Sequence, residues 1–165
     1  MRILGLDPGT ATIGFGVIET GHQKHRLLDY GCIKTAAGTP LPARLKQIYE
    51  DLESIVSEWK PQAVAIEEVF FSKNVKTAIQ VAQARGAMIQ QLALGPHQIS
   101  EYKPQQVKEA VCGYGNAEKK QVQKMVQLIL EMEEIPHPDD AADALALAIC
   151  HANSLKMQNL LVAQI

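Results

Sequence analysis

Two different hydrophobic periods divide this chain. Residues 2–7, 14–19 and 27–35 are three apolar segments of strand length, separated by short turns. From Leu41 to Trp59 the apolar residues recur every three or four positions, which predicts an amphipathic helix. Because strands joined by short turns pair in antiparallel fashion, the chain is predicted to begin with a three-stranded antiparallel meander. Gly31 is predicted to mark a β-bulge in its third strand.

Beyond this helix, strand-like and helix-like segments alternate. The remaining predicted elements are a strand at 63–67, a helix at 75–93, a strand at 97–101 and helices at 104–111, 118–133 and 139–154. Strands separated by helices join a sheet in parallel, through right-handed crossovers. The chain is therefore predicted to form a single α/β domain over residues 1–154, with a mixed five-stranded sheet and helices on both faces. Residues 155–165 are expected to be a C-terminal tail, ordered or disordered.

The composition limits the classes of protein that fit. Hydrophobic residues make up 47% and charged residues 21% of the chain, which is typical of a folded globular domain. No apolar run reaches the roughly 20 residues that a membrane span needs, and no signal peptide is expected. Cys32, Cys112 and Cys150 are far apart and form no CxxC pair. This favours reduced thiols in the cytoplasm over a disulfide framework or a zinc site.

The charges are unevenly distributed along the chain. A net charge of −2 argues against a protein that binds nucleic acid through an overall positive charge. Between Lys73 and Lys124, however, eight basic residues stand against three acidic ones. A basic sector beside an acidic one suits a protein that holds a polyanion while cations neutralise its acids. Charge alone leaves open the alternative that these side chains only cover solvated helix surfaces.

Four carboxylates are predicted to meet at one edge of the sheet. Asp7 ends the first strand and Glu67 ends the fourth, and these strands are parallel neighbours in the predicted topology. Asp140 and Asp143 stand three positions apart at the start of the last helix, so they share one helical face. Capping of the helix N-terminus would explain Asp139 or Asp140. It explains Asp143 poorly, because an Ala-rich segment typical of a buried helix follows.

Carboxylates that converge repel one another, so some of them must take up protons or bind cations. Mg²⁺ prefers carboxylate and water oxygens. Two such ions about 3.5–4 Å apart can activate a water and stabilise the leaving oxygen of a phosphodiester. The spacing leaves other roles open for Asp7, which lies in the turn Leu6-Asp7-Pro8-Gly9-Thr10. It could cap this turn or belong to a loop that binds the phosphates of a nucleotide.

Several separated motifs, in a fixed order, carry a resemblance to a known family. They are Gly5-Leu6-Asp7-Pro8-Gly9, Ala65-Ile66-Glu67-Glu68-Val69-Phe70, Gln83-Ala84-Arg85-Gly86 and Asp140-Ala141-Ala142-Asp143-Ala144-Leu145-Ala146, with further likeness at Leu45-Lys46, Val107-Lys108 and Gly115-Asn116-Ala117-Glu118-Lys119. Together they span nearly all of residues 1–154 and resemble the RuvC family of bacterial Holliday-junction resolvases. Asp-Pro-Gly alone would be a weak signal, and the ordered set makes the resemblance specific.

The resemblance implies an RNase H-like fold and a homodimer that cuts four-way DNA junctions by paired nicks. It implies two Mg²⁺ ions per active site, replaceable by Mn²⁺, and a RuvAB-like branch-migration complex as a partner. The catalytic and metal-binding acids of the family fall on Asp7, Glu67, Asp140 and Asp143, all of which are present. Because some members carry His at the third of these positions, Asp140 is an accepted variant.

The resemblance also assigns residues that would contact DNA. Phe70 matches a position that stacks on unpaired bases at the centre of a junction, although a core role for Phe70 and Phe71 fits the residues alone. Lys73 lies in the polar segment that follows and is assigned to DNA binding. Lys108 and Lys119 match basic positions near the cleft, so we expect them to hold the scissile phosphate or offset its charge.

Residues near these motifs receive other roles. Arg85 is expected to contact either DNA or a partner subunit. The Ala- and Gln-rich helix at 75–93 offers a weakly charged surface and is the predicted dimer interface. His137 and Asp139 match no family ligand and are expected to be turn and cap residues. Gly9 is expected to keep bulk away from Asp7.

Three other classes of protein share part of the pattern. The Asp-x-Gly-Thr phosphate loop of actin-like ATPases resembles residues 7–10, but that family uses two lobes and a far longer chain. The YqgF family, RNase H-like proteins tied to ribosomal RNA processing, usually has shorter chains that lack the Phe70–Asn74 continuation. A catalytically inactive binding module would be expected to have lost at least one of the four acids. The sequence therefore favours the nuclease.

Overall fold

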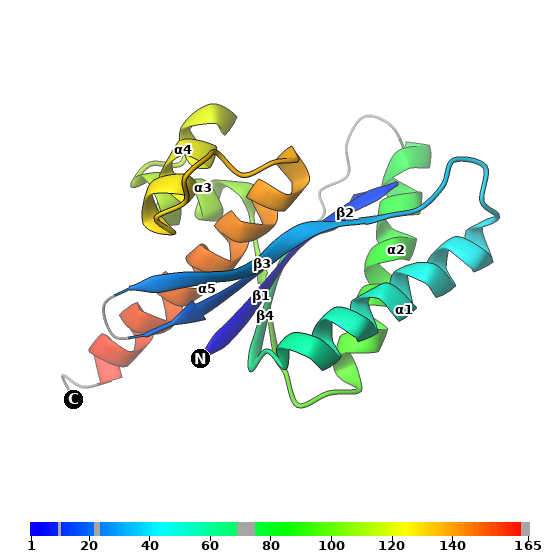
Figure 1. Cartoon of the computed structure of the whole chain (residues 1–165), viewed down its shortest axis with the longest axis horizontal. Coiled ribbons are helices and arrows are strands. Elements are labelled where there is room, and N and C mark those ends of the chain that lie inside the picture. Colours follow the sequence, from blue (N-terminus) through cyan, green and yellow to red (C-terminus); the bar gives the residue numbers. More distant parts are fainter. Residues whose placement is uncertain (10, 22–23, 69–74, 163–165) are drawn as a thin grey trace.

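The computed structural model describes residues 1–9, 11–21, 24–68 and 75–162. The elements follow one another as β1 (Arg2–Asp7), β2 (Thr12–Thr20), β3 (His25–Lys34), α1 (Leu41–Trp59), β4 (Ala63–Glu67), α2 (Val75–Ala93), β5 (Gln98–Tyr102), α3 (Pro104–Cys112), α4 (Lys119–Ile129) and α5 (Asp139–Val162). Figure 1 shows α1 and α2 on one side of the sheet and α3, α4 and α5 on the other. Within the described part of the chain, no helix is long and apolar enough to cross a membrane.

The five-stranded sheet has the predicted mixed topology, with the strand order β3-β2-β1-β4-β5. The pairs β1–β2 and β2–β3 are antiparallel, whereas β4 is parallel to both β1 and β5. Alternate side chains of β1 enter two separate cores, since Ile3 packs with α3, α4 and α5 while Leu4 and Leu6 pack with α1 and α2. The α/β class and the helices on both faces are thus confirmed.

Gly31 does not form the predicted bulge. The register shifts elsewhere, because Val17 pairs with Asp29 and Ile18 pairs with Leu27, which leaves Leu28 as the extra residue of β3. Gly31 pairs regularly with Phe15 of β2. A Cβ atom on Gly31 would lie 3.0 Å from the aromatic ring of Phe15, so the glycine leaves room for this ring.

Helices α4 and α5 end several residues away from the predicted positions. Helix α4 stops at Ile129 instead of continuing to residue 133, because Glu131 takes a left-handed conformation with φ 52°. The amide of Met132 donates to the carbonyl of Gln127 at 2.9 Å, which closes the helix end in the manner of a Schellman motif. Helix α5 continues through residues 155–162, expected as a tail, and Leu155 packs against the core beside it.

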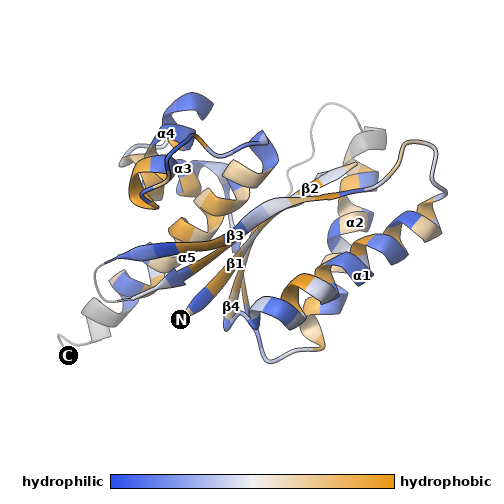
Figure 2. Cartoon of the chain, viewed as in Figure 1, coloured by the Kyte–Doolittle hydropathy of each residue, from blue (hydrophilic) through white to orange (hydrophobic). Residues whose placement is uncertain are grey.

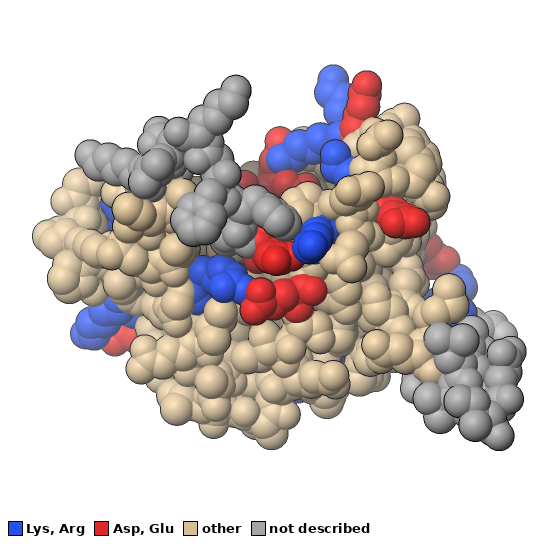
Figure 3. Space-filling view, turned by 180° about the vertical axis from the view of Figure 1, so that it is seen from behind, with Lys and Arg blue, Asp and Glu red and all other residues tan. Residues whose placement is uncertain are grey.

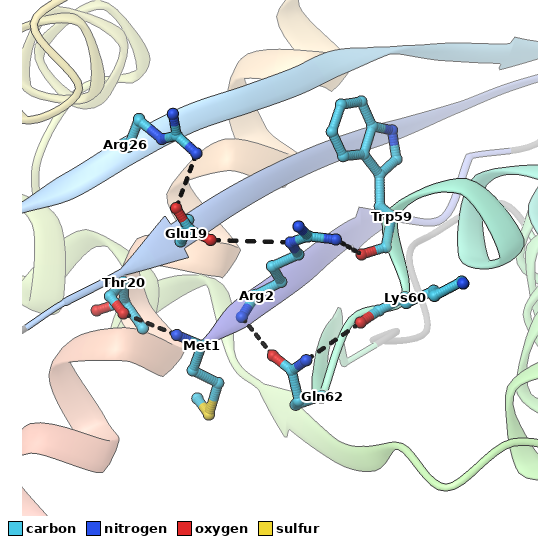
Figure 4. Close-up of polar contacts among 8 residues, drawn as sticks. All are labelled: Met1, Arg2, Glu19, Thr20, Arg26, Trp59, Lys60 and Gln62. Atoms are coloured by element: carbon cyan, nitrogen blue, oxygen red, sulfur yellow. Dashed lines mark hydrogen bonds and ion pairs between the residues drawn. The ribbon is translucent and has the colours of Figure 1, made fainter.

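The start of β1 is anchored by hydrogen bonds on both sides, as Figure 4 shows. The terminal amino group of Met1 donates to the carbonyl of Thr20 at 2.9 Å. The amide of Arg2 donates to Gln62 Oε1 at 2.6 Å, and its guanidinium Nη1 donates to the carbonyl of Trp59 at 2.9 Å. The N-terminal end of β1 is thereby held between β2 and the connection from α1 to β4.

Helix α5 lies directly on the backbone of β1 and β2. A Cβ atom on Gly5 would lie 1.9 Å from the carbonyl oxygen of Ala144, and one on Gly14 would lie 1.9 Å from that of Asp140. No side chain fits into so short a distance, so glycine is required at both positions. The helix contributes small buried residues such as Ala144 and Ala148, and Figure 2 shows α5 and the neighbouring strands as mostly hydrophobic.

We expect Gly5→Ala to lower the free energy of unfolding by about 3 kcal/mol or more, because α5 must move away from the sheet. Gly86→Ala is the matched control. Gly86 is exposed within α2 and an added Cβ atom would meet nothing within 4 Å. Alanine there should stabilise the helix by about 0.5–1 kcal/mol. Urea unfolding of both variants tests the contact, and equal stability of the two would contradict it.

Candidate active site

Asp7 and Glu67 leave the sheet side by side. The parallel pairing of β1 with β4 brings Leu6 opposite Ile66, and the two acids are the next residues of their strands. On the other side of β1, Asp7 pairs with Gly14, whose missing side chain lets the first turn of α5 approach. Both acids are only partly exposed.

Asp140 and Asp143 arrive from the first turns of α5. The carbonyl of Asp140 lies over Gly14, and Asp143 directly precedes Ala144, whose carbonyl lies over Gly5. Both acids therefore reach the sheet edge at which β1 ends. The structure brings the four predicted acids together, while their catalytic and metal-binding roles stay predictions.

Burial and the proximity of these acids to one another both shift their pKa values. Burial first, and then the charges of Glu67, Asp143 and Asp140, together raise the pKa of Asp7 to about 8. The pKa of Glu67 is raised by burial and then by Asp143, although a hydrogen bond with Asp7 lowers it. Burial also raises the pKa of Asp143. Near neutral pH this arrangement favours a proton on Asp7, which donates toward Glu67.

Lys119 contacts this acidic group through two ion pairs. It is the first residue of α4, and its Nζ lies 2.9 Å from Asp143 Oδ2 and 3.3 Å from Asp139 Oδ2. Burial alone would lower the pKa of Lys119, but the hydrogen bond and charge of Asp143, with those of Asp139, raise it above its ordinary value. The ammonium therefore stays charged and offsets part of the repulsion among the acids.

A pocket of about 210 Å³ opens beside these residues. It is lined by Glu67, Pro104, Val107, Lys108, Lys119, Val122, Asp143, Ala146 and Leu147. Two predicted acids and the two predicted phosphate-binding lysines thus share one small pocket with an apolar wall. Figure 3 shows Asp and Glu atoms gathered in the middle of one face with Lys and Arg atoms beside them.

Other predicted site residues are placed differently. Phe70, Phe71 and Lys73 lie outside the described residues, so their assignments stay predictions. Arg85 is mostly buried and forms an ion pair with Glu101 of the neighbouring β5, so its charge has a partner within the chain.

The tight turn between β1 and β2 itself requires a small residue at Gly9, and the predicted effect of Gly9 on the space around Asp7 stays a prediction. A Cβ atom on Gly9 would lie 2.0 Å from the carbonyl oxygen of Thr12, within the turn itself. Its small size therefore serves the tight connection between β1 and β2.

Asp139 makes two contacts that its predicted role as a cap does not include. Its Oδ1 accepts a hydrogen bond from Gln123 Nε2 at 2.8 Å, and its Oδ2 faces Lys119. Sequence reasoning missed Gln123 altogether. The spacing of these residues could have indicated the contact. Lys119 and Gln123 are four residues apart on one helix, and Asp139 and Asp143 are four apart on another, so each pair shares a helical face.

The donor set fits a hard divalent cation. Carboxylate oxygens are the ligands that Mg²⁺ and Mn²⁺ prefer. Burial first, and the neighbouring carboxylates second, raise the pKa of Asp7, Glu67 and Asp143, so a bound cation would favour their ionised forms. As arranged, no three His, Cys, Asp or Glu side chains among the described residues are placed to hold one ion.

The family model for the crossover junction endodeoxyribonuclease RuvC matches residues 3–151. The chain belongs to the RuvC family. RuvC of Syntrophomonas wolfei is 51% identical over 161 residues, which cover 98% of this chain and 94% of that protein. The RuvC structure from Thermus thermophilus has a TM-score of 0.89 at 35% identity and covers 96% of this chain and 97% of that one. T. thermophilus RuvC in complex with a Holliday junction substrate has a TM-score of 0.88 at 34% identity, with coverages of 95% and 96%.

These similarities confirm the predicted family and the RNase H-like fold. The RuvC match extends across β1, β4 and the first turns of α5, so all four acids lie within it.

The raised pKa of Asp7 predicts how stability depends on pH. Folding favours the protonated form of the Asp7 carboxyl. Its contribution to the stability of the folded state is therefore complete below the ordinary pKa of 3.8 and is lost as the pH rises through about 8. Asp7→Asn stays neutral throughout. Near pH 9 we expect the free energy of unfolding of this variant to exceed that of the parent by about 2–4 kcal/mol. Near pH 4 we expect no such difference.

Urea unfolding at both pH values, with a chelator present, measures this difference. Glu53→Gln, which removes an exposed carboxylate of α1, should match the parent at both. If Asp7→Asn showed the same gain near pH 4 as near pH 9, ionisation of Asp7 would not be the cause.

Proposed function

We propose that this chain is a structure-selective endonuclease that resolves four-way DNA junctions by paired, symmetric nicks in recombination and repair. The observation that carries the proposal is the meeting of four acids and two lysines at one sheet edge, in a chain that the RuvC family model matches over residues 3–151. The similarity to a T. thermophilus RuvC that is in complex with a Holliday junction substrate supports the same substrate class.

The acids would hold Mg²⁺, with Mn²⁺ as a substitute, as two ions in each active site. Asp7, Glu67, Asp140 and Asp143 supply the oxygen ligands. When bound, such ions activate a water and stabilise the leaving oxygen of a phosphodiester. Asp7 must give up its proton to serve as a ligand, because its pKa is raised to about 8. Metal binding is therefore expected to release a proton from this site and to strengthen with rising pH.

The lysines of the pocket would hold the DNA backbone. Lys108 and Lys119 line the same pocket as Glu67 and Asp143, so a phosphate that enters there meets two positive charges beside the acids. Lys73 and Phe70 complete the proposed DNA contacts, the former at a phosphate and the latter stacked on an opened base.

A homodimer would match the two-fold symmetry of the junction strands. We assign the interface to α2, where the large apolar side chain of Ile79 is 52% exposed. A RuvAB-like branch-migration complex is the proposed partner and the cytoplasm the proposed location. The free thiols of Cys32, Cys112 and Cys150 are compatible with a reducing compartment.

Asp7→Asn or Asp143→Asn should abolish nicking of a synthetic four-way junction in Mg²⁺. Loss of one carboxylate ligand removes several kcal/mol of transition-state stabilisation, so we expect the rate to fall about 10²–10⁴-fold. Junction binding should remain largely intact, because phosphate contacts supply most of the affinity. Single-turnover cleavage and gel-shift titration measure the two properties separately.

The matched control is Glu109→Gln, which removes an exposed acid next to Lys108 that does not line the pocket. It should cleave at the parent rate, and a linear duplex should resist all the proteins. Near-normal cleavage by either aspartate variant would show that the active site lies elsewhere.

Sedimentation at micromolar concentration is expected to show a dimer, and Ile79→Glu should shift it to monomer because a charge cannot be buried in the interface without a partner. Leu128→Glu is the control, since Leu128 is similarly exposed at 58% but lies on α4. A monomeric parent protein, with and without junction DNA, would exclude the symmetric dimer. A dimer that survives Ile79→Glu would place the interface outside α2.

A further inference from the structure

The ammonium of Lys119 lies between two carboxylates, one that lines the pocket and one that does not. Its ammonium contacts Asp143 Oδ2 at 2.9 Å and Asp139 Oδ2 at 3.3 Å. Asp143 lines the pocket with Glu67, whereas Asp139 is not among the lining residues and its side chain is 57% exposed. The lysine therefore has one partner inside the proposed active site and one partner beside it.

The partner beside the site is itself held in place. Gln123, only 7% exposed, donates from Nε2 to Asp139 Oδ1 at 2.8 Å. This hydrogen bond leaves Oδ2 of Asp139 facing Lys119. Lys119 and Gln123 lie one turn apart on α4, so the same helix carries the ammonium and the amide that orients its second partner.

We infer that Asp139, oriented by Gln123, is a positioning residue that keeps Lys119 at the pocket when a divalent cation occupies Asp143. This inference rests on the proposed metal-dependent function. An ammonium and a divalent cation on one carboxylate repel each other, so Lys119 must give up Asp143 when the ion binds. The Asp139 carboxylate then retains the ammonium beside the entering phosphate, where a solvated lysine would have to be ordered again at an entropic cost.

The inference is tested by the affinity for Mn²⁺ without DNA, measured by calorimetry. Gln123→Met changes no charge but releases Asp139, so Lys119 remains on Asp143 and competes with the ion. We expect the apparent Kd for Mn²⁺ to rise about three- to tenfold, and Asp139→Asn should raise it at least as much. Lys119→Met removes the competitor and should lower the Kd by a similar factor.

A double-mutant cycle separates positioning from simple loss of charge. In the Lys119→Met background, Gln123→Met and Asp139→Asn should each change the Kd by less than about twofold, because the residue that they position is gone. An effect of either substitution that persists in this background would mean that Asp139 acts on the ion itself, and this would overturn the inference.

Asp7→Asn distinguishes the failure of this inference from the failure of the proposed function. If Asp7→Asn binds Mn²⁺ as tightly as the parent, the acids are not the metal site and the proposed function fails. If Asp7→Asn loses binding while Gln123→Met and Asp139→Asn match the parent, only the role of Asp139 is overturned. Should Gln123→Met fail to fold, Asp139→Asn carries the test, because its side chain is exposed.

Discussion

The close contact between α5 and the backbone of β1 and β2 determines where the acids lie. Ala144 can approach Gly5 only because the strand carries no side chain there. Asp143 is the residue before Ala144, and Asp7 is two residues beyond Gly5 on the same face of β1. The packing of small residues therefore also sets the distance between a helix carboxylate and a strand carboxylate, so that stability and the proposed active site depend on one contact.

That contact brings like charges together in a partly buried place. Burial and mutual repulsion raise the pKa of Asp7, Glu67 and Asp143, which means that the ionised cluster disfavours the folded state. Lys119 offsets part of this repulsion from α4. The repulsion that Lys119 does not offset would favour the binding of a cation. A cation that binds only the folded state stabilises that state. Local instability and the proposed affinity for a cation would thus be two consequences of one arrangement.

Much of the fold could be predicted because it depends on local rules. The change from a period of two to a period of three or four separates strands from helices. The short turns after β1 and β2 require antiparallel pairing, and the helices before β4 and β5 require parallel pairing. The errors concern positions that depend on contacts distant in the sequence. Gly31 makes room for the ring of Phe15 instead of a bulge, and α5 continues where Leu155 finds apolar neighbours.

By itself the sequence determined the order of the strands, the convergence of Asp7 with Glu67 and the family, because each depends on residue order and spacing. Only the tertiary structure decided which side chains meet across α4 and α5. Lys119 and Asp139 belong to separate helices, and the ion pair between them depends on how these helices pack. No periodicity in the sequence reports the angle between α4 and α5, because this angle results from the side chains that fill the space between the helices and the sheet. The protonation of Asp7 was decided in the same way, since it depends on burial and on three acids brought near it by the fold.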